Sequence, residues 1–190
     1  LLYKFVLANL AYKVMSLVMA KTILQVLAYS YAYGIYMFFD FAGYSLMAIG
    51  TGYMLGIKVP ENFNKPFIST DMKDFWARWH ISLSEWFRDF IFTRFIMSSM
   101  KKKRFKTRLT TASVGFIINM FVMGIWHGLA IQYLVYGLYH GVLLALTEIY
   151  QKKSKFDKKN KKKRWYKIVS WAITMNFVMF GFLIFSGHII

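Results

Sequence analysis

Long apolar segments alternate with short, strongly charged segments along this chain. The hydrocarbon core of a bilayer needs about 20 consecutive apolar residues in a spanning helix. Segments of roughly this kind lie at residues 1–19, 22–39, 41–57, 110–129, 131–150 and 165–190. Asp40 separates the second segment from the third, and a tight turn at residues 128–132 separates the fourth from the fifth. The pattern predicts an all-α, polytopic membrane helix bundle.

The region after the third segment has a different pattern. Ser69 or Thr70 is the predicted N-cap of a helix, because two aspartates follow in its first turn. Residues 75–90 then predict an amphipathic helix that does not span the membrane. At about 100° per residue, its polar stripe contains four side chains, Arg78, Ser82, Glu85 and Asp89. His80 is expected on the opposite, apolar face.

Composition supports a membrane protein. The chain is 57% hydrophobic and 20% aromatic, yet its 25 Lys and Arg residues far exceed its 8 Asp and Glu residues. A soluble domain of 190 residues does not combine these properties. Nucleic-acid binding would explain the charge but not the apolar segments, so no nucleic-acid partner is expected. The absence of cysteine excludes disulfides, thiolate catalysis and cysteine-ligated metals.

Two basic runs, at residues 101–108 and 152–167, flank the fourth and fifth apolar segments. Because Lys and Arg collect in cytoplasmic loops, both runs are expected to face the cytoplasm and to contact anionic lipids. The turn between the two segments then faces outward, which places His127 in the outer half of its helix. Glycine pairs at four-residue spacing would let these two helices approach closely: Gly124 with Gly128, and Gly137 with Gly141.

His127 is the most informative single residue. It lies within residues 110–150, where Glu148 is the one formally charged side chain. An ionisable side chain at membrane depth needs a compensating partner, so it indicates a functional site. The alternative is a structural histidine that a neighbouring helix satisfies.

His80 is a second histidine on an apolar surface, and Ser84 and Arg88 follow it at i+4 and i+8. These side chains form a line from the apolar face toward the polar edge. The alternative is an interfacial helix with aromatic anchors and a tolerated histidine. No metal site is expected, because no third ligand accompanies the two histidines at a suitable spacing. Proton transfer by imidazole is the chemistry that these residues suit.

Three elements together resemble the membrane-bound O-acyltransferase (MBOAT) family. They are the tryptophan-rich residues 75–91, the Trp-His-Gly element at residues 126–128, and Phe-Asp-Phe-Ala-Gly-Tyr-Ser at residues 39–45. Leu46 stands where the alginate-acetylating branch would have aspartate, so the chain is more similar to the branch that transfers D-alanine. Members of the family have more spans than this chain. The resemblance therefore implies the catalytic, C-terminal portion of an MBOAT fold.

The resemblance implies an O-acyltransferase in the bacterial cell membrane. It would take D-alanine from the phosphopantetheine thioester of an acidic carrier protein and move it toward teichoic acid on the outer face. No tightly bound cofactor is expected, and other membrane proteins of the D-alanylation pathway are expected partners.

The resemblance also assigns roles to residues. His127 would be the general base, a role worth about 10²–10⁴-fold in rate. His80 would polarise the carbonyl or orient the acceptor, and His80 or Asn119 would stabilise the oxyanion. The expected supporting residues are Trp79, Ser84, Arg88, Asn119 and Trp126.

The carrier would dock within residues 70–108, on an apolar surface beside positive charge. An acidic carrier would bind a basic surface faster and in a fixed orientation. The expected contact residues are Phe95, Ile96, Met97, Lys101, Lys102, Arg104 and Arg108. The alternative is that this stretch packs on its own protein or on lipid.

Two other function classes fit the same features. A transporter or proton-conducting subunit would use the two histidines as a proton relay. A non-catalytic scaffold of a cell-envelope complex would recruit acidic partners through the basic runs.

Overall fold

A computed structural model describes residues 1–18 and 22–189 of the chain. The regular elements in these ranges are helices, apart from one isolated antiparallel bridge between Phe63 and Trp79. The all-α fold is therefore confirmed. Residues 19 and 190, at the ends of two predicted spans, lie outside the described residues. The elements in chain order are η1 (Leu2–Leu7), α1 (Ala8–Leu17), α2 (Ile23–Met54), η2 (Pro66–Ile68), α3 (Met72–Trp76), α4 (Ile81–Phe87), η3 (Arg88–Phe92), α5 (Thr93–Lys101), α6 (Arg108–His127), α7 (Ile131–Lys153), α8 (Lys155–Asn160) and α9 (Arg164–Phe185).

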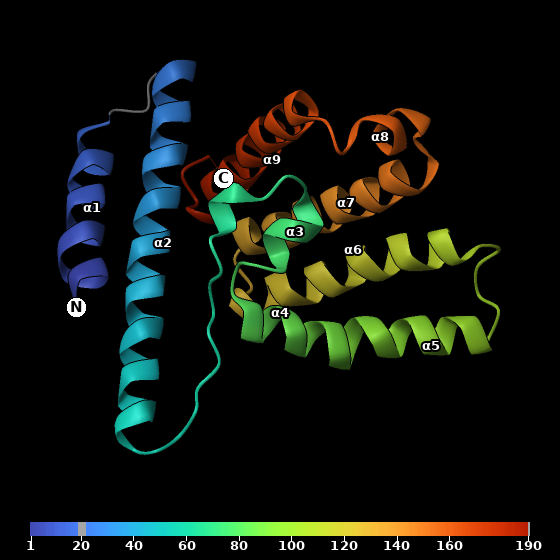
Figure 1. Cartoon of the computed structure of the whole chain (residues 1–190), viewed down its shortest axis with the longest axis horizontal. Coiled ribbons are helices and arrows are strands. Elements are labelled where there is room, and N and C mark those ends of the chain that lie inside the picture. The colour runs from blue at the N-terminus through green and yellow to red at the C-terminus, as the bar shows by residue number, and fades with distance from the viewer. Residues whose placement is uncertain (19–21, 190) are drawn as a thin grey trace.

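Helix α2 is continuous over the two segments that we predicted as separate spans at 22–39 and 41–57, so the predicted break is wrong. Asp40 does not interrupt the helix because Lys4, on the neighbouring η1, forms an ion pair with its carboxylate. The negative charge of Asp40 is thus neutralised by a side chain of the neighbouring helix, and the backbone of α2 continues without a break. In Figure 1, α1 and α2 form an antiparallel pair that stands across the direction of α5 and α6.

Helices α6 and α7 form an antiparallel hairpin, with its turn inside the predicted range 128–132. Two glycines allow their backbones to meet. A Cβ atom on Gly124 would lie 2.4 Å from the carbonyl oxygen of Tyr133, and one on Gly137 would lie 2.5 Å from that of Met120. The expected close approach therefore exists at Gly124 and Gly137. Gly128, which the prediction paired with Gly124, has a different role. It ends α6 with a φ of 150°, which a side chain would disfavour.

Helix α9 closes the core. The rings of Phe75 and Trp79 stack with their centroids 5.6 Å apart, and Phe182 of α9 lies 4.9 Å from Trp79. All three side chains are buried. Helices α6 and α9 are each long and apolar enough to cross a membrane. The other predicted spans stay predictions.

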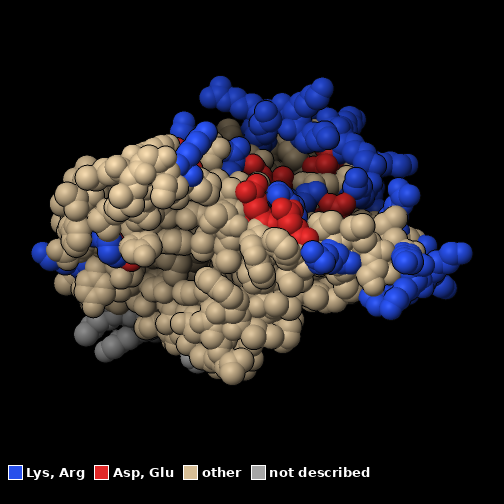
Figure 2. All heavy atoms as spheres, turned by 90° about the horizontal axis from the view of Figure 1, so that it is seen from below, with Lys and Arg blue, Asp and Glu red and all other residues tan. Residues whose placement is uncertain are grey.

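The two basic runs lie at the same end of the molecule. The loop between α5 and α6 and the connection from α7 to α9 both lie toward the right-hand side of Figure 1. Figure 2 shows the corresponding gathering of Lys and Arg around a smaller acidic cluster, while most of the remaining face is uncharged. Both ends of the α6–α7 hairpin therefore point to one side.

The tryptophan-rich region is not the single helix that we predicted at 75–90. Helix α3 ends at Trp76 and α4 begins at Ile81, while His80 between them has a φ of 47°. The left-handed conformation of His80 breaks the helical periodicity, so the predicted polar stripe does not continue across it. The predicted cap is also wrong. Asp71, rather than Ser69 or Thr70, caps α3 by accepting hydrogen bonds from the backbone of residues 73 and 74.

The close contact of α6 with α7 gives a stability prediction. Gly124→Ala should lower the free energy of unfolding by about 1–3 kcal/mol, because the new methyl group meets a backbone carbonyl that cannot rotate away. Gly50→Ala is the matched control: among the described residues, no atom outside the local backbone of α2 lies within 4 Å of its Cβ position, so helix propensity should raise stability by up to about 1 kcal/mol. Thermal unfolding of the detergent-solubilised protein measures both. Equal stability of the two variants would contradict the contact.

Candidate functional site

The structure brings both His80 and His127 into contact with one tryptophan. The ring of Trp126 lies 6.5 Å from that of His80 and 4.8 Å from that of His127. His127 is the last residue of α6, and the ring of Phe185 from α9 stands edge-on to it at 5.0 Å. Trp126 itself is 57% exposed, so the space beside the two imidazoles is open in this chain.

His80 is held by Asn62, a residue that sequence reasoning missed. Nδ1 of His80 lies 3.4 Å from Oδ1 of Asn62, and the backbone N–H of Ser82 donates to the same oxygen at 3.2 Å. The amide group of Asn62 donates in turn to Ser45 on α2 at 3.0 Å. Asn62 lies in a short polar connection between Pro60 and Pro66, and such a connection does not point to a particular partner.

Burial lowers the pKa of His80, and the nearby His127 lowers it further. His80 belongs to the connection between α3 and α4, which are both too short to span a membrane. The imidazole of His80 is therefore neutral at physiological pH. A neutral imidazole has one ring nitrogen that donates and one that accepts a hydrogen bond.

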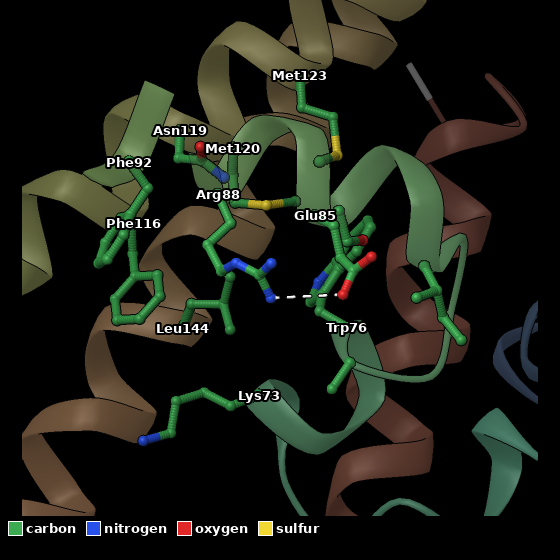
Figure 3. A pocket seen from close by; sticks show the side chains of 13 residues that line it. Lys73, Trp76, Glu85, Arg88, Phe92, Phe116, Asn119, Met120, Met123 and Leu144 are labelled. Atoms are coloured by element: carbon green, nitrogen blue, oxygen red, sulfur yellow. Dashed lines mark ion pairs between the residues drawn. The ribbon is translucent and has the colours of Figure 1, made fainter. Parts of the chain in front are cut away.

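A cavity of about 340 Å³ lies between the α3–α4–η3 region and the α6–α7 hairpin (Figure 3). It combines an apolar wall with a few polar and charged side chains, as small-molecule sites do. It contains three of the predicted supporting residues, Ser84, Arg88 and Asn119. Its lining consists of Lys73, Trp76, Ala77, Ile81, Ser84, Glu85, Arg88, Phe92, Phe116, Asn119, Met120, Met123 and Leu144.

Neither His80 nor His127, the two predicted catalytic histidines, lines this cavity, but its end at Met123 approaches His127. The α6 wall runs from Phe116 to Met123. Met123 lies one helical turn before His127. At the other end, Lys73 donates to Glu148 of α7 at 2.7 Å. The cavity thus extends from the level of this ion pair toward the level of His127.

Charged groups at the cavity have defined partners. Arg88 lies 3.6 Å from Glu85, as the dashed line in Figure 3 marks, and its Nε donates to Asp89 at 2.8 Å. The hydrogen bond to Asp89 raises the pKa of Arg88, so this side chain stays charged. Asn119 differs: its side-chain oxygen is buried without a hydrogen-bond partner in the described ranges, residues 1–18 and 22–189.

His140 has a role that the sequence did not indicate. It is fully buried on α7, and the indole N–H of Trp76 donates to its Nδ1 at 3.3 Å. A Cβ atom on Gly181 of α9 would lie 2.3 Å from its Nε2. His140 therefore joins the tryptophan-rich region to the hairpin and α9 as part of the core. Within the described residues, no group of three His, Cys, Asp or Glu could hold a metal ion.

The predicted supporting and docking residues fall into different environments. Trp79 is a core side chain whose backbone oxygen accepts from Ser84. Phe95 and Ile96 are partly buried, whereas Met97 is 66% exposed. The basic docking residues are exposed at the end of α5 and the start of α6: Lys101, Lys102, Arg104 and Arg108.

Residues 1–189 match the family MBOAT, membrane-bound O-acyltransferase. The teichoic acid D-alanyltransferase of Bacillus subtilis is 50% identical to this chain over 190 residues, which cover 98% of the chain and 48% of that protein. The protein of the same name from Streptococcus thermophilus is 49% identical over 175 residues, covering 87% of the chain and 42% of that protein. A probable alginate O-acetylase of Pseudomonas aeruginosa is 38% identical over 157 residues, covering 83% of the chain and 28% of that protein. The chain thus spans less than half the length of these curated relatives.

The unpartnered oxygen of Asn119 gives a second stability prediction. Asn119→Leu should raise the free energy of unfolding by about 1 kcal/mol, because it replaces an unsatisfied buried polar group by an apolar group of similar shape. The matched control is Asn160→Leu, because Asn160 is equally buried but donates to Phe156 at 2.9 Å, so its loss should destabilise by a similar amount. Thermal unfolding distinguishes the two. A destabilised Asn119→Leu protein would show that Asn119 is structural.

Proposed function

Since the chain belongs to the membrane-bound O-acyltransferase family, we propose that it provides the catalytic region of an enzyme that transfers D-alanine to teichoic acid. The observation that carries this proposal is the pair His80 and His127 around Trp126, beside a cavity that reaches toward the basic end of the molecule. Membership in this family and the two apolar helices agree with a location in the cell membrane.

In the proposed reaction, a hydroxyl group attacks the carbonyl carbon of a D-alanyl thioester. The imidazole of His127 takes the proton from the hydroxyl as the new C–O bond forms. The C–S bond then breaks, and the leaving thiolate accepts that proton, so that an ester and a free thiol result. A thioester is already activated, so the protein has to position the groups and move one proton.

We assign the donor arm to the cavity. A phosphopantetheine arm carries amide N–H groups, and the unpartnered oxygen of Asn119 is an acceptor that one of them would satisfy. The guanidinium of Arg88, which also lines the cavity, would attract the phosphate, so that the arm points away from Arg88. This direction places the thioester toward Met123, and therefore toward His127.

The carrier would dock where the basic run at 101–108 and the exposed Met97 adjoin each other. Figure 2 supports this surface, because Lys and Arg gather along that part of the molecule. An acidic carrier is attracted by such a surface before it makes contact. The basic end would then face the cytoplasm, and His127 would lie toward the outer face. Anionic lipids and other membrane proteins of the pathway are the further proposed partners.

Replacing the proposed base tests the function. In the protein expressed in its cell membrane, His127→Ala should reduce D-alanine incorporation into teichoic acid by about 10²–10⁴-fold at unchanged expression and carrier binding. His188→Ala is the control, because His188 is an exposed histidine that stacks on Tyr29 and has no role in the proposed reaction. Retained transfer with altered ion flux would favour a transporter. Unchanged transfer and flux would favour a scaffold.

The docking surface is tested separately. Charge reversal of Lys101, Lys102 and Arg104 to Glu should weaken binding of the carrier, most strongly at low salt, while the thermal stability stays unchanged. The same change at Lys161, Lys162 and Lys163 alters the net charge equally and should have a much smaller effect. A pull-down at low and high salt measures both. Equal binding by the two variants would exclude a specific surface at 101–108.

A further inference from the structure

The side chain of Asn62 connects three elements around His80. Its Oδ1 faces Nδ1 of His80 at 3.4 Å and accepts from the backbone N–H of Ser82 at 3.2 Å. The hydroxyl of Ser82 donates to the same oxygen. Its Nδ2 donates to Ser45 of α2 at 3.0 Å. One amide group thus links the loop after α2, helix α2 itself and the turn that carries His80.

These contacts fix the direction of the amide group. A backbone N–H can only donate, so the atom of Asn62 that faces Ser82 N has to be the oxygen. The NH₂ group then faces Ser45, whose hydroxyl oxygen accepts it. No other direction of the amide satisfies both neighbours.

The direction of the amide fixes the imidazole in turn. Because Nδ1 of His80 faces an oxygen that only accepts, Nδ1 has to carry the hydrogen. In a neutral imidazole the other nitrogen, Nε2, then has the free lone pair. The side of His80 that is left for a substrate is therefore a hydrogen-bond acceptor.

We propose that Asn62 is a positioning residue that holds His80 as the Nδ1–H tautomer, so that Nε2 of His80 accepts a hydrogen bond from a donor group of the acceptor molecule other than the attacking hydroxyl, whose one hydrogen goes to His127. The inference rests on the proposed transfer reaction. It decides between the two roles that the sequence left open for His80. A carbonyl offers no hydrogen to Nε2, so His80 orients the acceptor molecule and does not polarise the thioester carbonyl.

The surrounding backbone makes this role separable from a structural one. The carbonyl of Asn62 accepts from the N–H of Ile81 at 3.0 Å, and the N–H of Asn64 donates to the carbonyl of Arg78 at 3.0 Å. Phe63 adds an aromatic contact with Trp79 at 5.0 Å. These contacts do not use the Asn62 side chain, so the loop should keep its place when that side chain is replaced.

The tautomer is measured directly by ring ¹⁵N chemical shifts. The protein is labelled with ¹⁵N-histidine in membranes, and the signal of His80 is identified by its loss in His80→Gly, because glycine tolerates the φ of 47° there. The wild type should show a protonated Nδ1 at His80. Asn62→Leu should show a mixture of both tautomers. A wild-type His80 protonated at Nε2 would overturn the inference whether or not the protein transfers D-alanine.

Kinetics test whether the tautomer matters. Asn62→Leu should lower kcat by about tenfold or more, with little change in the KM for the carrier. Asn62→Asp keeps the acceptor oxygen but adds a negative charge, which favours the imidazolium form of His80. Its activity should recover at high pH, with the acidic limb of the pH profile moved to higher pH. An unmoved limb would show a purely structural role and overturn the inference.

A double-mutant cycle supplies the last control. On a His80→Gly background, Asn62→Leu should cause no further loss of kcat, because Asn62 acts through His80. Additive losses would overturn the inference. Ser45→Ala removes a partner of the amide but keeps the contacts of Oδ1, so its kcat should stay near that of the wild type. Absence of transfer by the wild type would refute the proposed function, while the chemical shifts would still decide the tautomer.

Discussion

The close contact between α6 and α7 is the constraint on which the rest of the structure depends. Gly124 and Gly137 let each backbone lie against a carbonyl of the other helix, which fixes the relative height of the two helices. That height sets the position of His127 at the end of α6 and of His140 within α7. Through the hydrogen bond from Trp76 to His140, it also places the tryptophan-rich region. Without close contact, the helices could slide, because apolar side chains alone leave their register poorly defined in lipid.

A second layer of the structure is built on this hairpin. Between α3 and α4 the chain turns through His80, whose left-handed backbone directs the imidazole away from the regular helix surface. Aromatic packing of Trp79 against α9 holds this turn from inside, and Asn62 holds it from the loop after α2. Two separate groups of polar side chains therefore surround this turn. The cavity with Asn119 and Arg88 lies on one side of the turn, and Trp126 with the two histidines lies on another.

Local sequence patterns predicted several features of this region that the structure also has. The Trp-His-Gly element ends a helix in front of a glycine turn, and Ser84, Arg88 and Asn119 do line one cavity. The failures share a physical cause. The break predicted at Asp40 ignored its partner Lys4, which lies 36 residues away, and the helix predicted at 75–90 ignored the contacts that hold His80 out of a helix. In both places a tertiary contact overruled the local preference of the chain.

The sequence by itself determined the fold class and the family of the protein, and it singled out His127 as a candidate residue. A long apolar run with a single formal charge has to be buried in protein or in lipid. A histidine within that run needs a compensating partner, whatever the arrangement of its neighbours. Only the tertiary structure decided which polar groups meet. Asn62 and His80 are 18 residues apart, and no periodicity relates a loop residue to a turn residue. Their contact exists because α2 and the aromatic core bring two irregular segments together, and that placement is a property of packing rather than of local sequence.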